Sequence, residues 1–256
     1  MALLTDGSPN DTEALRVYET AILSVANVEG IDLDAKLALA TEEVSQDVLD
    51  ILLDHSSTND PLGSARRSVG VSDVAVTAQL KRWHALHTLE IVYRDAYNNQ
   101  LNDRYQSKWD EYRELARSAR ELTMRFGIGL VNAPIPVADR PTLGSVAGVL
   151  PGTTYYARVS WVTANGQEGL PSSATTFATP DGGALVVTAV NAPPNVTGWN
   201  VYIGLTDAGL MKQNIAPLTI GSSFTVPPGG VVTGAAPGNG QGADVYVTGG
   251  RLMRRG

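Results

Sequence analysis

Hydrophobic residues recur every three or four positions in the first half of the chain, a spacing that places them on one face of a helix. One such run covers residues 12–27, after Asn10-Asp11-Thr12, whose short polar side chains favour a helix start. Gly30 interrupts the pattern, and a second run continues to Leu53. We therefore expect two amphipathic helices here, the second with its apolar positions at Leu33, Leu37, Thr41, Val44, Val48 and Leu52.

A longer periodic stretch follows a loop expected over residues 54–63. Ser72-Asp73 is the expected cap, and hydrophobic residues then recur as far as Phe126. The stretch is much longer than an ordinary helix, so we expect two antiparallel helices. Their turn is expected near Asn98-Asn99 or Asn102-Asp103, because asparagine tolerates left-handed backbone. With Gly127 and Gly129 as the end, the pattern predicts a bundle of about four helices.

Beyond residue 153 the period changes to two, which is typical of strands. Tyr155, Ala157, Val159 and Trp161 share one face, and Asn165-Gly166, a strong hairpin signal, follows directly. Further strand-like runs are separated by turns rich in proline and glycine, and short strands at such intervals predict an immunoglobulin-like β-sandwich. These runs cover residues 185–190, 199–203, 212–216 and 223–226.

Charge divides the chain at the same place as the periodicity. All but five of the 19 lysines and arginines, and all but four of the 26 acidic residues, lie at or before Arg140. We therefore predict an α + β multidomain protein. Its expected parts are a helical domain (1–131), a linker (132–141), a β-sandwich (142–228) and an extended glycine-rich tail (229–256).

The tail contains one strand-like segment, residues 243–248, with no evident place in the sandwich. Glycine-rich sequence before it cannot form a core, so we expect a strand on a flexible tether. Such a strand is suited to pairing with the sheet edge of a partner. Basic residues follow it, at Arg251, Arg254 and Arg255.

Composition excludes several kinds of protein. The formal net charge of −7 disfavours general nucleic-acid binding, which needs a concentrated basic surface. The absence of cysteine excludes disulfides and thiolate metal sites. No apolar run reaches the roughly 20 residues that span a bilayer, and the first residues do not resemble a secretion signal, so we expect assembly in the cytosol and no membrane contact.

Two clusters of side chains are candidates for metal binding. His84, His87 and Glu90 form a row on one predicted helix, and acidic residues gather between Glu42 and Asp54. The neighbouring Trp83 and Leu86 favour packed histidines over a metal site, and the acidic cluster matches a solvated helix face better than a calcium loop. We expect no metal and no cofactor.

Catalytic motifs are missing as well. No serine lies in a Gly-x-Ser-x-Gly motif, and no serine, histidine and acid set suggests a triad. Trp161 and Trp199 lie in predicted strands, where a core position is a better interpretation than a sugar-binding platform. The sequence therefore predicts a binding or structural protein and not an enzyme.

Two stretches resemble known families. The segments LKRWHALHTL (80–89), YRDAY (93–97) and RYQSKW (104–109) resemble the helical core of head-to-tail adaptor proteins of tailed bacteriophages. Separately, YYARVSWVTANGQEG (155–169) and GWNVYI (198–203) are similar to immunoglobulin or fibronectin-III-like modules appended to virion proteins. The strand with the Tyr-x-x-x-Val-x-Trp pattern, usually late in a fibronectin module, comes first here.

The resemblance implies a virion protein assembled in the host cytoplasm, a dodecameric ring in the neck between the portal protein and a tail terminator or stopper. DNA would only pass through its channel, which acidic walls suit by repelling phosphates. The C-terminal segment of such adaptors often reaches into the portal, which makes it the expected docking segment. Its candidate docking residues are Val245, Tyr246, Val247, Arg251, Leu252, Arg254 and Arg255.

Two other functions remain open from the sequence. One is a tail, baseplate or host-surface binding protein whose β-sandwich is the binding module and whose helices form an oligomerisation stem. The other is an enzyme with an unrecognised glycan or metal site. The adaptor predicts a ring, or a monomer that forms one on the portal, and the host-surface binding protein predicts a trimer or free fibre. The enzyme predicts a turnover that is lost on mutating His84, His87 or a carboxylate.

Overall fold

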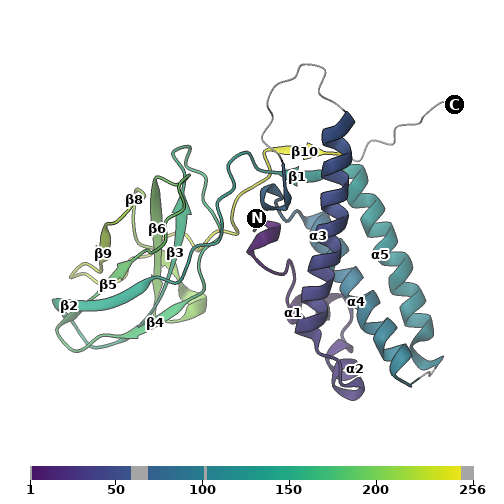
Figure 1. Ribbon diagram of the computed structural model, residues 1–256. Helices are drawn as coiled ribbons and strands as arrows, with labels where there is room; N and C mark the ends of the chain where they lie inside the picture. Colours follow the sequence, from purple (N-terminus) through teal and green to yellow (C-terminus); the bar gives the residue numbers. More distant parts are fainter. Residues whose placement is uncertain (1, 59–68, 101–102, 249–256) are drawn as a thin grey trace. The chain divides into compact units, whose positions relative to one another are not determined.

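The structure is a computed structural model that describes residues 2–58, 69–100 and 103–248. The chain divides into two compact units (Figure 1). Of the described residues, those within 4–132 join residues 243–248 in a helical unit, and residues 133–242 belong to a β unit with Ala2 and Leu3. The helical unit is therefore built from two separate parts of the chain.

The described part of the helical unit contains five α-helices, one more than the sequence predicted. They are α1 (Thr12–Tyr18), α2 (Ile22–Glu29), α3 (Leu33–Thr58), α4 (Ala78–Gln100) and α5 (Gln106–Phe126). The extra helix arises because the predicted run over residues 12–27 is broken at Glu19, whose backbone is extended. The Glu19 carboxylate accepts hydrogen bonds from the Tyr112 hydroxyl (2.9 Å) and the Ala21 amide (3.3 Å), which hold the break.

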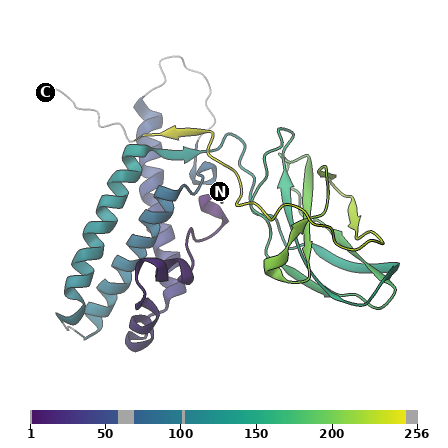
Figure 2. The ribbon, with the colours of Figure 1, turned by 180° about the vertical axis from the view of Figure 1, so that it is seen from behind.

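Helix α4 is the centre of the unit, and Figures 1 and 2 show it beside both α3 and α5. The apolar positions of α4 that recur every three or four residues are buried as far as Tyr93, and so are residues between them, such as Ala85, Ile91 and Val92. A helix that is buried on most of its sides is typical of a bundle interior. Helix α3 buries Leu33, Leu37, Val44, Val48 and Leu52 as predicted, with Ala40 in place of Thr41.

Helix α4 begins later than predicted. Ser72 and Asp73 belong to a short 3₁₀ helix (Val71–Asp73), and the Asp73 carboxylate accepts from the Gly70 amide. The side chain of Thr77 caps α4 instead, because its Oγ1 accepts a hydrogen bond from the Leu80 amide (3.2 Å). The predicted division into two helices is confirmed, since α4 ends at Gln100 and a 3₁₀ turn (Asp103–Tyr105) leads into α5.

The described helices include none with the length and apolar character needed to cross a membrane.

The β unit contains two antiparallel sheets that share one core. One sheet has the order β2-β5-β9, and the other has the order β4-β3-β6-β7, with β8 also paired to β6. Trp161 on β3, Trp199 on β6 and Leu185 on β5 are buried in the core, as the sequence predicted for both tryptophans. The strands are β2 (Thr142–Leu150), β3 (Thr154–Val162), β4 (Thr175–Ala178), β5 (Gly183–Thr188), β6 (Gly198–Gly204), β7 (Met211–Lys212), β8 (Leu218–Thr219) and β9 (Ser223–Thr225).

The expected linker and tether are both packed on the β unit. Ile135 and Ala138, placed by the sequence in a linker, are buried in the core of the two sheets. In the glycine-rich segment, Val231 packs against the same core, and the Ala235 carbonyl accepts from the Lys212 amide. Glycine is required at position 234, because a β-carbon there would lie 2.3 Å from the Lys212 carbonyl oxygen. Residues 229–242 thus follow the sheet rather than forming a free tether.

Candidate functional site

The predicted docking strand pairs within its own chain. Strand β10 (Val245–Val247) lies antiparallel to β1 (Ile128–Leu130), which directly follows α5, with Gly129 opposite Tyr246. The expectation of a strand without an intramolecular partner is therefore wrong. The prediction that it lies outside the sandwich is correct, because β10 belongs to the helical unit.

Strand β1 occupies the middle of this small sheet and β10 its edge. On the side of β1 away from β10, Leu130 bridges to Val74, and the Gly129 carbonyl accepts from the Ala75 amide (2.9 Å). Among the described residues, none pairs with the outer edge of β10. An edge of this kind presents free backbone groups to a further strand.

The side chains of β10 are partly open to solvent. Val245 is 46% exposed and Tyr246 is 56% exposed, whereas Val247 is half-buried. Tyr246 packs over the glycines after α5, because a β-carbon at Gly127 would lie 3.2 Å from Tyr246 Cβ and one at Gly129 would lie 3.4 Å from Tyr246 Cε1. An exposed aromatic ring fixed in this way is a suitable anchor for a partner.

Asp244 fixes the start of β10. Its amide donates to the Leu130 carbonyl (2.8 Å), and its carboxylate accepts from the Asn132 amide (2.8 Å). The other predicted docking residues, Arg251, Leu252, Arg254 and Arg255, lie outside the described residues.

A groove adjoins the end of the helical unit that carries this sheet. It has a volume of about 230 Å³ and lies between the first turns of α4 and the last turns of α5. Phe126 on its rim is 57% exposed. The groove was not predicted from the sequence, although the apolar residues at the end of α5 could have indicated a binding surface there. Its lining residues are Ala78, Gln79, Arg82, Ala119, Leu122 and Phe126.

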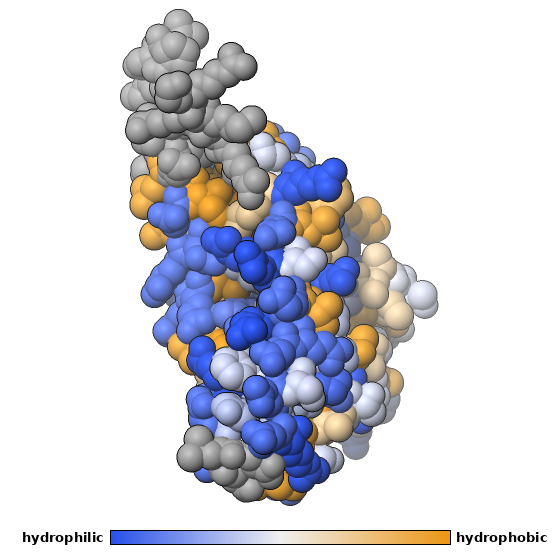
Figure 3. Space-filling view, turned by 90° about the vertical axis from the view of Figure 1, so that its right-hand side faces the viewer, coloured by the Kyte–Doolittle hydropathy of each residue, from blue (hydrophilic) through white to orange (hydrophobic). Residues whose placement is uncertain are grey.

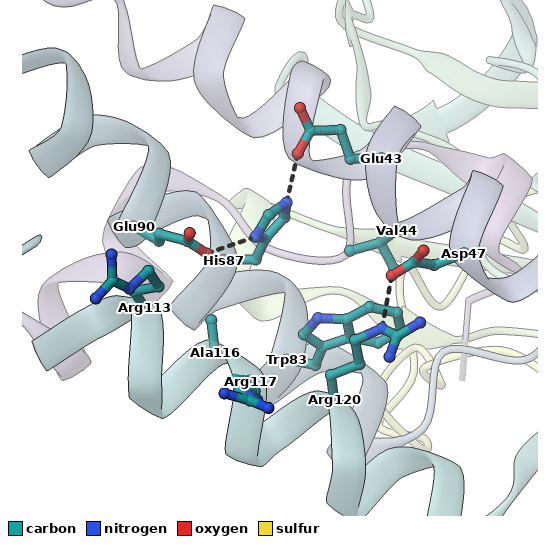
Figure 4. Close-up of a pocket in the computed structure, with 10 residues that line it drawn as sticks. All are labelled: Glu43, Val44, Asp47, Trp83, His87, Glu90, Arg113, Ala116, Arg117 and Arg120. Carbon is teal, nitrogen blue, oxygen red and sulfur yellow. Dashed lines mark hydrogen bonds and ion pairs between the residues drawn. The ribbon is translucent and has the colours of Figure 1, made fainter. Parts of the chain in front are cut away.

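A second cavity, of about 200 Å³, lies among α3, α4 and α5 (Figure 4). Here His87 on α4 lies between two carboxylates, with Nε2 2.6 Å from Glu43 Oε2 and Nδ1 3.0 Å from Glu90 Oε2. Carboxylates only accept hydrogen bonds, so both ring nitrogens donate and the ring is an imidazolium. Burial alone lowers the pKa of His87, but the bonds to Glu90 and Glu43 outweigh it and raise this pKa above its usual value.

The remaining charges of this cavity are also paired. Arg120 on α5 binds Asp47 on α3 (2.7 Å) and lies over the Trp83 ring, with its guanidinium carbon 6.0 Å from the centroid. Arg113 pairs with Asp110 (3.0 Å), and Arg117 pairs more loosely with Glu121. The pairs His87–Glu43 and Arg120–Asp47 therefore connect α3 to α4 and α5, whereas the partners of Arg113 and Arg117 lie on α5 itself.

His84 is on the same helix as His87 but contacts different residues. Its Nδ1 is 3.0 Å from Asn10 Nδ2 and its Nε2 is 2.9 Å from Thr41 Oγ1, which fits a neutral ring protonated at Nε2. Burial lowers the pKa of His84 to about 4, and repulsion from His87 acts in the same direction. The predicted histidine row therefore consists of one neutral and one charged residue with separate structural roles.

Among the described residues, no group of three or more histidine, aspartate or glutamate residues is arranged to hold a metal ion. Figure 3 shows that one face of the helical unit is largely hydrophilic, with hydrophobic residues interspersed toward its upper end.

Comparison with models of known protein families finds no match, and a search of curated proteins finds no relative of this chain.

Proposed function

We propose that this chain is a head-to-tail adaptor of a tailed bacteriophage, a structural virion protein that forms a ring between the portal protein and a tail terminator or stopper. The observation that supports the proposal most directly is the open edge of β10. It places Val245 and Tyr246, two of the expected docking residues, exposed at the edge of the helical unit. The chain then continues into the basic sequence that contains Arg251, Arg254 and Arg255.

In this proposal the helical unit is the part that assembles. Its acidic residues are placed to repel DNA that passes through the ring, and its ion pairs between α3, α4 and α5 hold the helices rigid. The β unit is an appended module of the immunoglobulin type, which fits its two antiparallel sheets, of three and five strands, around a core that contains tryptophan.

The test is binding to the portal protein of the same virus, followed by electron microscopy of the mixture. The full chain is expected to form a ring on the portal. Truncation after Gly242 removes β10 and everything beyond it, and should abolish binding. Truncation after Thr248 keeps the β1–β10 pairing and removes only the basic end, and should weaken binding in a salt-dependent manner. A full chain that does not bind its portal would refute the proposal.

A second candidate rests on an edge strand of the β unit. Strand β2 is at the edge of its sheet, and Val146 and Val149 on it are 49% and 73% exposed. A nine-residue edge without charged side chains is suited to adding a strand from another protein. This favours the alternative of a tail, baseplate or host-surface binding protein, for which the isolated β unit, and not the helical unit, would bind the target.

A further inference from the structure

The groove between α4 and α5 differs from the His87 cavity because the arginine that lines it has no ion pair among the described residues. Arg82 is the only charged residue among those that line it, and no ion pair or hydrogen bond of its side chain is found within the described residues. Arg125, exposed in the last turn of α5, likewise has no ion pair there. The groove therefore combines apolar walls with positive charge that its own unit does not neutralise.

The residues that follow Phe126 on the groove wall lie against β10. Phe126 on its wall precedes Gly127, and a β-carbon at Gly127 would lie 3.2 Å from Tyr246 Cβ. Thr77 precedes Ala78 on the opposite wall, and a β-carbon at Gly129 would lie 2.9 Å from Thr77 Cγ2 and 3.4 Å from the Tyr246 ring. Tyr246 thus packs against the chain next to both walls.

The composition of this surface indicates its partner. Aromatic residues and arginine dominate the energetics of protein interfaces. Here the exposed Phe126 lines the same groove as Arg82, which has no ion pair among the described residues. A cavity of about 230 Å³ with walls of Ala119, Leu122 and Phe126 suits one bulky apolar side chain. The unpaired Arg82 suits a carboxylate, which a guanidinium binds through two parallel hydrogen bonds.

We propose that the α4–α5 groove binds an extended acidic segment of the portal protein, which adds a strand to β10, inserts an apolar side chain between Leu122 and Phe126, and pairs a carboxylate with Arg82. This inference rests on the adaptor function proposed above and specifies the chemistry of the contact. It predicts that the portal segment carries an aspartate or glutamate close to a large apolar residue.

The experiment measures the affinity of full-length variants for the purified portal ring. Arg82→Glu and Phe126→Ala change exposed positions, so folding should be preserved, and each is expected to weaken binding about tenfold or more. Arg82→Lys keeps the charge but not the paired hydrogen bonds, so it should lose less than Arg82→Glu. The matched control is Arg117→Glu, an exposed arginine on α5 at the His87 cavity, which should bind like the unmodified chain.

The outcomes separate this inference from the adaptor function. If the full chain binds the portal but Arg82→Glu and Phe126→Ala bind equally well, the groove is not the contact, and the adaptor function stands. Equal losses of affinity in Arg82→Glu and Arg117→Glu would show a general effect of charge and would contradict binding in the groove. If the unmodified chain does not bind, the adaptor function itself fails.

Discussion

His87 on α4 and Glu43 on α3 are joined by a hydrogen bond of 2.6 Å between Nε2 and Oε2, and the same imidazolium is bound to Glu90 one turn farther along α4. The side chain of His87 is 19% exposed. The side chain of its partner Glu43 is 40% exposed. The pair links the two helices, and the link depends on proton binding by His87.

Stability should depend on pH through His87. Its pKa is raised in the folded state, so its contribution is fully present below the unfolded pKa of about 6.5 and is lost as pH rises through the folded value. Urea unfolding of the unmodified chain and of His87→Gln, measured between pH 5.5 and 8.5 in steps of about one unit, should show a difference in free energy that shrinks with rising pH. A difference that does not change with pH would contradict the charged pair.

His84 should act in the opposite direction. Its pKa falls to about 4 on folding, so the unfolded chain binds a proton more readily between about pH 6.5 and 4, and stability is lost over that interval. The full shift corresponds to roughly 3 kcal/mol, since one pKa unit is about 1.4 kcal/mol. The loss on acidification should be smaller in His84→Gln than in the unmodified chain, measured by the same titration below pH 6.5.

Replacing Gly129 should detach β10. A β-carbon at this position would lie 2.8 Å from Ala243 Cβ and 2.9 Å from Thr77 Cγ2, closer than real contacts allow. Gly129→Ala is expected to cost about 1–3 kcal/mol and to speed hydrogen exchange at Val245 to Val247. Gly144→Ala on β2 is the control, because a β-carbon there meets nothing within 4 Å. Unchanged exchange in β10 would contradict the close packing.

Glu168 should be important for the stability of the β unit. Its carboxylate accepts hydrogen bonds from the buried hydroxyls of Ser160 and Tyr202, and Glu168→Ala leaves both donors without this acceptor. We expect a loss of about 1–3 kcal/mol for each unsatisfied donor. Asp207→Ala, which breaks the more exposed pair with Arg158, should cost no more than about 1 kcal/mol. Thermal unfolding of the two variants gives the comparison.

Gln241 should fix the start of the β unit. Its side chain is buried, accepts from the Ile135 amide (2.6 Å) and donates to the Ala133 carbonyl (3.0 Å). Gln241→Ala should cost about 1–3 kcal/mol, because the Ile135 amide is left buried without a partner. Gln241→Glu keeps the acceptor but lacks the donor and buries a charge. It should also be destabilising, least so at low pH where the carboxyl is protonated.

Elements defined by local pattern could be predicted from the sequence. The buried positions of α3 between Leu33 and Leu52 follow from the spacing of apolar residues alone, and so do the core positions of Trp161 and Trp199. The break at Glu19 could not, because it depends on Tyr112, which is distant in sequence. Strands β2 and β4 were missed because their alternation is weak, and most of β2 is exposed.

The candidate site was predictable in part. The strand character of Val245 to Val247 and its absence from the sandwich follow from the sequence. Its pairing with β1 could not be foreseen, since Ile128 to Leu130 follow α5 as a short segment without alternation and are buried on both faces. The groove could not be predicted from the sequence either, because it forms only where the end of α5 lies beside the start of α4.

Because β10 returns to pair with β1, the helical unit can be completed only at a late stage of translation. Asn132 and Asp244, which are hydrogen-bonded, are separated by 112 positions. All five described helices and the whole β unit are therefore synthesised before β10 exists to close the helical unit. A nascent or prematurely terminated chain has the helices but no finished edge, so the surface proposed for docking forms only after translation has passed Val247.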